Sequence, residues 1–132
     1  MIRQIFVNLP VKDLKKSREF FTKLGFTFNP KLTDENATCM ILGEHMYAML
    51  LEETYFKTFA PKEICAANKS TGVLVSLAVE SREKVDELVD KVQASGGRDT
   101  SRSHAHGWMY GRSFEDIDGH SWEIFYMDES RL

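Results

Sequence analysis

The acidic residue Glu123 is the strongest candidate for a chemical role in this sequence. It follows the turn-forming segment Asp116-Ile117-Asp118-Gly119 and lies in an alternating run, 121–126, in which Ser121 and Phe125 share its side. A carboxylate in a partly apolar cavity can act as a general base or bind a cationic ligand. We therefore expect either acid–base chemistry or ligand binding at Glu123.

Two histidines, His104 and His106, precede this run and are spaced by two residues. In an extended strand that spacing places both side chains on one side, where two imidazoles could bind a transition metal together with Glu123. Either histidine could instead transfer protons at the mouth of a pocket, and His106 is our second catalytic candidate. The alternative is a solvated loop with no chemistry.

Aromatic and basic side chains offer further contacts for a ligand. Five aromatic residues could stack on a flat molecule, namely Tyr55, Phe56, Phe59, Trp108 and Tyr110. The long irregular segment 52–71 could instead only cap a cavity. Arg112 could hold an anionic substrate in the bidentate manner, and a surface ion pair is the other interpretation.

The segments that must position these residues form an internal repeat of two similar units. The segment Val7-Asn8-Leu9-Pro10-Val11-Lys12-Asp13 has a counterpart in Val75-Ser76-Leu77-Ala78-Val79-Glu80-Ser81, 68 positions later. Each copy is an alternating strand, a polar turn and an amphipathic helix. Duplicated units usually face one another, and the crease between them is a natural small-molecule site.

The hydrophobic pattern predicts the order β-α-β-β-β in each half. The expected strands of the first half cover residues 3–9, 26–28, 37–42 and 46–51, with a helix that begins near Asp13 and ends at Gly25. The second half is predicted to have strands at 73–79, 109–114 and 121–126 and one helix over 82–94. We expect an α+β fold in which the two βαβββ repeats form a curved, half-open cup with helices on its outer face. The predicted boundaries are about 1–52 for the first repeat, 53–71 for a connecting lid segment and about 72–128 for the second repeat.

Strand alternation assigns one face of each sheet to the helix and the other face to a cavity. Val73, Val75, Leu77 and Val79 should face the helix, because they are uniformly apolar. The predicted cavity is mainly apolar with few polar groups, as in most ligand pockets. Its predicted lining residues are Phe6, Asn8, Tyr47, Met49, Leu74, Ser76, Glu123 and Phe125, with Phe56, Trp108 and Tyr110 as further substrate contacts.

Composition excludes several other classes of protein. The 132 residues suit one compact domain, and a net charge of −3 without a basic stripe makes nucleic acid an unexpected partner. The sequence shows neither a signal peptide nor an apolar run long enough for a membrane helix. Cys39 and Cys65 match no metal or redox spacing, so we expect two reduced thiols in a cytoplasmic protein.

Several of these segments together resemble the vicinal oxygen chelate superfamily, which includes glyoxalases, extradiol dioxygenases, and bleomycin- and fosfomycin-resistance proteins. The resembling segments are Val11-Lys12-Asp13-Leu14, Phe20-Phe21 and Leu24-Gly25-Phe26 around the first helix, and the run from Asp116 to Glu123. The chain looks closest to small bacterial proteins described as predicted lactoylglutathione lyases. The resemblance covers the whole chain and implies the cup fold and a homodimer. It leaves open whether the repeats pair within one chain or swap between two.

The resemblance also locates the metal ligands of catalytic relatives. Their four inward side chains, a His or Gln, a Glu, a His and a Glu, fall here on Phe6, on or near Met49, on Leu74 and on Glu123. Catalytic zinc sites use about three protein ligands, and only Glu123 carries a suitable oxygen. We therefore expect no metal cofactor, with divalent Ni, Zn, Fe or Mn as the alternative. If Glu123 has no chemical role, we expect it to be a former ligand position that pairs with Asn8, Ser76, Arg112 or a water.

Three functions follow as competing hypotheses. The first is a binding protein that holds a small organic molecule without the metal, as bleomycin-resistance relatives do. The second is a lyase, isomerase or dioxygenase-like enzyme that uses Glu123 with a nearby His or Tyr, with or without a metal. The third is an accessory module whose pocket is vestigial.

Overall fold

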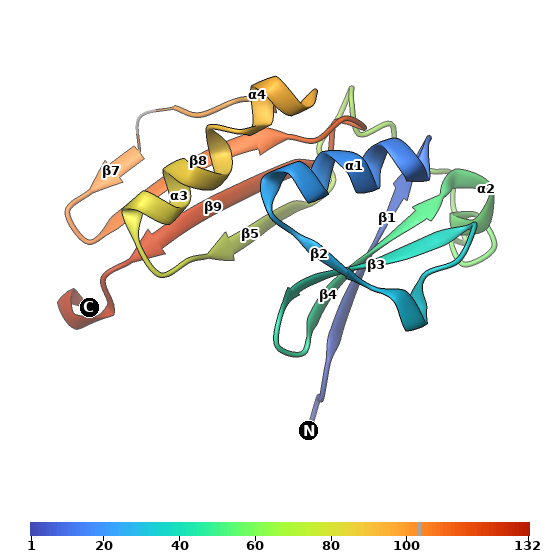
Figure 1. Cartoon of the computed structure of the whole chain (residues 1–132), viewed down its shortest axis with the longest axis horizontal. Coiled ribbons are helices and arrows are strands. Elements are labelled where there is room, and N and C mark those ends of the chain that lie inside the picture. Colours follow the sequence, from blue (N-terminus) through green and yellow to red (C-terminus); the bar gives the residue numbers. More distant parts are fainter. Residues whose placement is uncertain (103) are drawn as a thin grey trace. The chain divides into compact units, whose positions relative to one another are not determined.

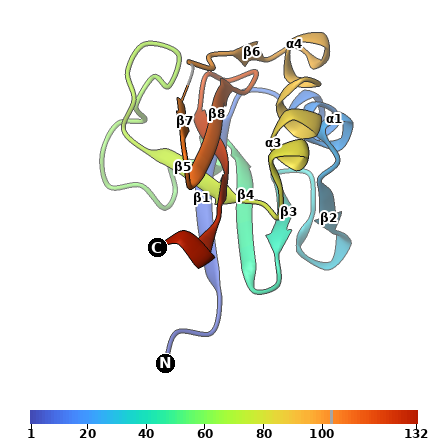
Figure 2. The same ribbon diagram turned by 90° about the vertical axis from the view of Figure 1, so that its left-hand side faces the viewer.

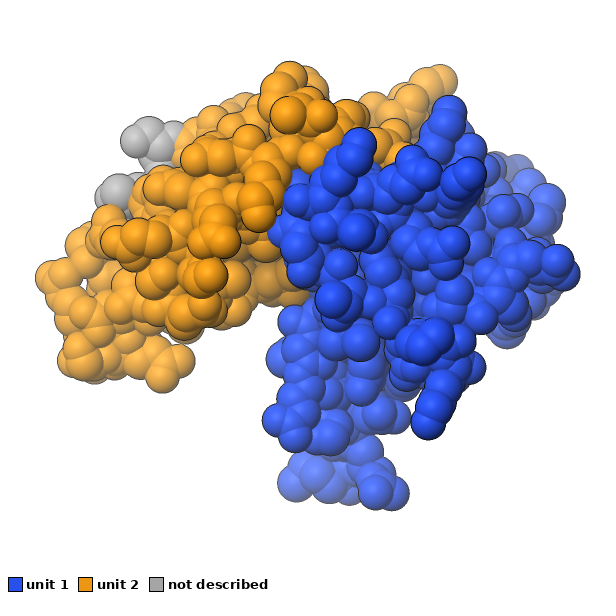
Figure 3. Space-filling view, in the orientation of Figure 1, with its two compact units in different colours: residues 1–65 blue, residues 66–132 orange. Residues whose placement is uncertain are grey.

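The computed structural model describes every residue except Ser103, and for 104–106 it describes the backbone alone. The chain divides into two compact units, Met1–Cys65 and Ala66–Leu132, which Figure 3 shows in different colours. The division falls within the segment predicted to connect the two repeats. None of the described helices is long and apolar enough to cross a membrane.

Unit 1 contains one βαβββ repeat, as the sequence predicts (Figure 1). Its elements are β1 (Ile5–Val11), α1 (Leu14–Leu24), β2 (Thr27–Asn29), η1 (Pro30–Leu32), β3 (Ala37–Gly43), β4 (Met46–Glu52) and α2 (Glu53–Phe56). The strand order is β1-β4-β3-β2, with β1 parallel to β4 and the other pairs antiparallel. The predicted helix limits are confirmed, because Asp13 accepts a hydrogen bond from the Lys16 amide and Gly25 ends the helix with φ of 105°.

Unit 2 repeats this topology in the order β5-β9-β8-β6, with β5 parallel to β9 and β7 paired to β8. Its elements are β5 (Leu74–Ala78), α3 (Arg82–Val89), α4 (Val92–Ser95), β6 (Arg98–Asp99), β7 (His104–His106), β8 (Met109–Glu115), β9 (Ser121–Met127) and η2 (Glu129–Arg131). In Figure 2 the helix α3 lies along one side of β8. The α+β class and the duplicated strand–helix–strand order are therefore confirmed.

Two details of unit 2 differ from the prediction. The single helix expected over 82–94 is interrupted between α3 and α4, where the Lys91 amide bonds to the Leu88 carbonyl three residues back instead of four. The loop expected around the histidines contains the short strand β7, whose backbone pairs with β8. The pairing is a local hairpin, in which Ala105 lies opposite Tyr110, and three residues are too few for alternation to reveal a strand.

Each unit has its own apolar core between helix and sheet. In unit 1, Phe20 and Phe21 of α1 and Ala48 and Leu50 of β4 are each at most 1% exposed. In unit 2 the fully buried residues are Val85 and Val92 from the helices and Phe114, Trp122 and Ile124 from the sheet. These residues identify the face of each sheet that packs against the helix. Val73, which the pattern predicts on this face, is an exception, since it precedes β5 and is 61% exposed.

The turn between β8 and β9 fixes where β9 begins. The buried Asp116 carboxylate accepts bonds of 3.0 Å from the amides of Asp118 and His120 and from the Trp122 indole. Gly119 has φ of 90°, and a Cβ there would lie 2.7 Å from the Asn68 Cα. No other residue type fits this position without moving the backbone.

Replacing Gly119 with Ala should destabilise the protein by roughly 2 kcal/mol or more, because left-handed strain and a backbone clash add. Chemical unfolding followed by circular dichroism measures the loss. Gly72→Ala is the matched control, since a Cβ at Gly72 has nothing within 4 Å and the backbone needs no left-handed conformation. Equal stability of the two variants would contradict the described turn.

Candidate functional site

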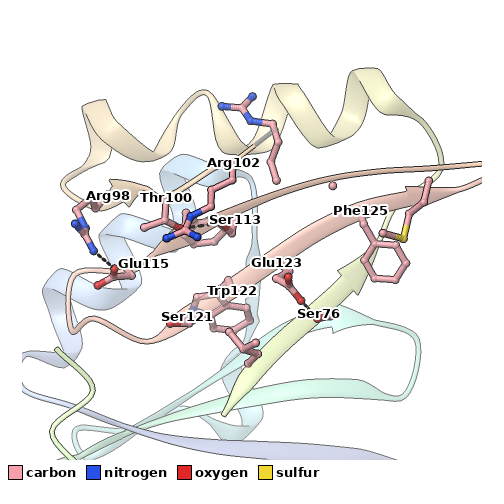
Figure 4. Close-up of a pocket in the computed structure, with 15 residues that line it drawn as sticks. Ser76, Arg98, Thr100, Arg102, Ser113, Glu115, Ser121, Trp122, Glu123 and Phe125 are labelled. Carbon is pink, nitrogen blue, oxygen red and sulfur yellow. Dashed lines mark hydrogen bonds and ion pairs between the residues drawn. The ribbon is translucent and has the colours of Figure 1, made fainter. Parts of the chain in front are cut away.

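The principal candidate site is a cavity of about 700 Å³ on the unit 2 sheet (Figure 4). Its lining comes from β5, β9 and β8, from the edge strand β6 and from the segment that follows β6. The lining residues are Leu74, Ser76, Arg98, Thr100, Arg102, Met109, Gly111, Arg112, Ser113, Phe114, Glu115, Ser121, Trp122, Glu123 and Phe125. Four predicted contacts meet here, namely Leu74, Ser76, Glu123 and Phe125.

Glu123 is held by a short hydrogen bond at the centre of this cavity. The parallel register of β5 and β9 sets Ser76 opposite Glu123, and the Ser76 hydroxyl donates to the Glu123 carboxylate at 2.6 Å (Figure 4). This length is typical of a charge-assisted O–H···O⁻ bond. The predicted pairing of Glu123 with Ser76 is confirmed. Glu123 remains exposed, so its second oxygen is accessible to a ligand.

Apolar side chains line the cavity beside Glu123. Leu74 from β5 is 58% exposed, Phe125 is partly buried on β9, and Met109 lies on β8. Phe125 is two residues from Glu123 on the same strand, so both side chains leave the sheet on one face. The surroundings of Glu123 are therefore partly apolar, as the sequence predicts.

The opposite edge of the cavity is polar and contains residues that sequence reasoning missed. Arg98 of β6 forms an ion pair with Glu115 of β8, and the hydroxyls of Thr100 and Ser113 lie 2.9 Å apart. The side chain of Arg102 lies over this edge in Figure 4. Ser113 pairs with Glu123 and Glu115 pairs with Ser121 across β8 and β9, so both lie on the face of Glu123. The alternation of side chains along β8 could have predicted this.

The polar groups of Arg112 and Tyr110 bond to aspartates on the α3 side of the sheet, although Arg112 also borders the cavity. Arg112 contacts the carboxylates of Asp86 at 2.9 Å, Asp90 at 2.7 Å and Asp99 at 2.7 Å, and its side chain is 16% exposed. The Tyr110 hydroxyl donates to Asp86 at 2.6 Å. The prediction that Tyr110 faces the ligand is wrong, because even-numbered positions of β8 point to α3. Arg112 is neither a surface ion pair nor a partner of Glu123, since three aspartates engage its guanidinium.

These contacts shift the ionisation of the cluster. The hydrogen bond from Tyr110 lowers the pKa of Asp86; burial opposes this, and Arg112 lowers it further. Burial raises the pKa of Asp99, but hydrogen bonds from Ser101 and Arg112 lower it by more, so this pKa lies below its ordinary value. Burial alone would lower the pKa of Arg112, yet the surrounding aspartates raise it above its ordinary value. The cluster ties α3 and β6 to β8 through the bonds of Arg112 to Asp86, Asp90 and Asp99.

Unit 1 has a smaller cavity of about 420 Å³ at the equivalent place on its sheet. Asn8 and Met49 line it and are paired in register, as Ser76 and Glu123 are in unit 2. The other lining residues are Lys31, Leu32, Thr33, Asp34, Ala37, Leu51, Tyr55 and Phe59. The repeat therefore places the predicted inward residues of both units at equivalent sheet positions.

The remaining predicted contacts lie outside these two cavities. Phe6 stacks on Tyr47 with ring centroids 4.8 Å apart. Phe56 is half-buried in α2, and Trp108 is 38% exposed between β7 and β8. The side chains of His104 and His106 lie outside the described residues, so their predicted roles stay predictions.

The donor set does not fit the divalent cation of catalytic relatives. Of the four corresponding positions, Phe6 and Leu74 are hydrocarbon side chains and Met49 offers only a weakly coordinating thioether. Glu123 is the one oxygen ligand, and Ser76 already bonds to it. Within the part of the chain whose side chains are described, no three His, Cys, Asp or Glu residues lie close enough to hold a metal.

Comparison with known proteins agrees with the topology and the repeat. The family model for bleomycin resistance protein-like N-terminal sequences matches residues 3–43. The structure of hypothetical protein SA1046 from S. aureus is similar, with 30% identity, a TM-score of 0.80 and coverage of 96% of this chain and 94% of that one. No curated protein sequence matches.

Two other solved structures share the fold at lower identity. A glyoxalase-related enzyme from Fulvimarina pelagi has 18% identity and a TM-score of 0.76, and the match covers 95% of this chain and 88% of that one. The fosfomycin resistance protein FosX from Listeria monocytogenes has 22% identity, a TM-score of 0.69 and full coverage of both chains. The chain therefore has the same fold as these proteins.

The Arg112 cluster should make stability fall on acidification. Asp86 and Asp99 have lowered pKa values, so their stabilising effect is complete above the unfolded-state pKa of about 3.9 and is lost as pH falls through the folded-state pKa. The free energy of unfolding, measured with urea at several pH values, should decrease below about pH 4. Arg112→Met should cost roughly 2 kcal/mol or more at neutral pH and flatten this dependence.

Lys84→Met is the control for this prediction, because Lys84 forms only an exposed pair with Glu87 at 3.3 Å. It should change stability by less than about 1 kcal/mol and keep the wild-type pH dependence. An Arg112→Met protein with wild-type stability at every pH would show that the cluster does not tie α3 to β8.

Proposed function

We propose that this protein binds a small organic molecule in the unit 2 cavity without a divalent cation. The observation that carries the proposal is the Ser76–Glu123 pair, which places a single hydrogen-bonded carboxylate among apolar side chains in a cavity of about 700 Å³. Ligand pockets commonly measure roughly 300–1,000 Å³ and combine an apolar lining with few polar groups. The cavity has this size, and it sets an apolar part at Leu74, Met109 and Phe125 beside polar and charged side chains.

The chemistry of the four inward positions supports the metal-free form of the proposal. Among the described side chains that line the cavity, Leu74 cannot coordinate a cation, and no three His, Cys, Asp or Glu residues lie close enough to hold one. Such a site is too weak to hold a transition metal against cellular competitors. Recognition would therefore rest on shape, apolar contact and hydrogen bonding to Glu123.

An enzymatic role for Glu123 is the second candidate. The 2.6 Å bond from the Ser76 hydroxyl shows that Glu123 can receive an O–H donor at the geometry that general-base catalysis requires. A lyase or isomerase would need a second proton-transfer group. Tyr110 faces α3, and the side chain of His106 is outside the described residues. We place binding first because the Ser76–Glu123 pair and the cavity support it directly.

Two further properties enter the proposal from the sequence and the resemblance alone. We expect the protein to be cytoplasmic and to form a homodimer. Light scattering of the purified protein measures whether it forms a dimer.

Thermal unfolding with candidate ligands tests the proposed function. The set includes bleomycin, fosfomycin and the glutathione hemithioacetal of methylglyoxal, with a wider panel of metabolites. At least one compound should stabilise the protein, by about 2.7 kcal/mol at 100 times its Kd. The shift should be the same with and without EDTA. A shift that disappears in EDTA and returns with Mn²⁺ or Zn²⁺ would refute the metal-free form.

A pair of neighbouring substitutions shows whether the compound occupies this cavity. Leu74→Trp should abolish the shift, because Leu74 lines the cavity and is exposed enough to accept a larger ring. Val73→Trp should keep the shift, since Val73 is about as exposed and does not line the cavity.

Glu123→Gln separates the two candidate functions. If Glu123 is a catalytic base, this variant should lose turnover and keep nearly the same affinity for the ligand.

A further inference from the structure

Positive and negative charges are distributed unevenly along the cavity, and this distribution indicates which chemical class of ligand it binds. Three arginines contribute to the lining, namely Arg98, Arg102 and Arg112. Two of them are neutralised: Arg112 by three aspartates on the α3 side, and Arg98 by Glu115. Among the residues that the structure describes, no carboxylate pairs with Arg102. Arg102 is thus the cavity's available positive charge.

Hydroxyl groups line the same cavity as Arg102. Thr100 and Ser113 lie 2.9 Å apart, and Figure 4 labels both in the part of the cavity where it labels Arg102. Each hydroxyl can donate one hydrogen bond and rotate to suit a ligand. A guanidinium with neighbouring hydroxyl donors is a favourable environment for a carboxylate or phosphonate group.

The apolar part of the cavity lies on the other side of β8. Phe125 and Glu123 are on β9, and Arg102 follows the edge strand β6. Because β8 separates these strands and neighbouring strands lie about 4.8 Å apart, the two parts are roughly 10 Å from each other. The Glu123 carboxylate would repel an anion placed beside it, so an acidic group is directed to the Arg102 edge.

Unit 1 shows a similar arrangement. Its cavity also receives a basic side chain, Lys31, from the segment between its second and third strands. The aromatic pair Tyr55 and Phe59 supplies an apolar part. In both copies a basic side chain from this connection and an apolar surface line the cavity, and in unit 1 the Asp34 carboxylate lines it too.

We propose that the ligand of the unit 2 cavity is an amphipathic acid, whose carboxylate or phosphonate group binds Arg102 and whose apolar body lies against Leu74 and Phe125. This rests on the proposed binding function. Glu123 and Ser76 then contact the body between these ends, where a hydroxyl or amide N–H of the ligand can donate to Glu123. Arg102 acts as a specificity residue for the acidic end.

Titration calorimetry with a matched series of compounds tests this assignment. The probes are phenylbutyrate and phenylpropylphosphonate as acids, phenylbutyramide as the neutral analogue and phenylbutylamine as the cation. The acids should bind at least about tenfold more tightly than the amide, and the amine should bind most weakly at the Arg102 edge. Comparing the two acids identifies which oxyanion the site prefers.

Two arginine variants provide the control within the same cavity. Arg102→Gln should remove the preference for acids over the amide and leave amide binding unchanged. Arg98→Gln should change the preference by less than about threefold, because Glu115 already neutralises Arg98. Both arginines are exposed, so we expect both variants to fold, and circular dichroism verifies this.

The outcomes distinguish this inference from the proposed function. If the amide binds as tightly as the acids, or if Arg102→Gln behaves as wild type, the cavity remains a ligand site but the acidic class is wrong. If none of the four compounds binds, the assignment of ligand class is overturned. Thermal unfolding with candidate ligands, in the presence and absence of EDTA, then tests separately whether the protein binds a ligand without a metal.

Discussion

The parallel pairing of β5 with β9 is the constraint on which the candidate site depends. It places Ser76 directly opposite Glu123, and the 2.6 Å bond between them gives the carboxylate a defined position on the sheet. The register in turn depends on the turn before β9, where Asp116 binds the Trp122 indole. A shift of one residue would move Glu123 to the α3 side of the sheet. The polar chemistry of the cavity is therefore a consequence of strand register.

The two units show how one topology can hold different chemistry. Asn8 and Met49 are paired in β1 and β4 as Ser76 and Glu123 are paired in β5 and β9. Only unit 2 retains a carboxylate at this pair, while unit 1 offers an amide and a thioether. Catalytic relatives need ligands from several strands together. Leu74 beside Glu123 supplies no ligand atom, and the unit 2 cavity combines apolar side chains with arginines, hydroxyls and two carboxylates, a lining that suits an organic molecule.

Much of the fold follows from local pattern, whereas the charged contacts do not. Apolar alternation and a terminal glycine predicted the repeat, the limits of α1 and the cavity face of Glu123 correctly, because each is set by neighbours along the chain. The cluster around Arg112 joins residues up to 26 positions apart, and no local pattern specifies such partners. Tyr110 was misplaced because its aromatic character was read without the alternation of β8. Arg102 was missed because it lies in an irregular segment, where periodicity assigns no face.

Metal content is the most direct measurement of the central claim. The protein should be purified without chelators or affinity metals and analysed by inductively coupled plasma mass spectrometry. We predict no stoichiometric Ni, Zn, Fe or Mn, because Phe6, Met49 and Leu74 replace three ligands and Ser76 bonds to the fourth. One equivalent of metal per chain, lost on replacing Glu123 with Gln, would contradict a metal-free site.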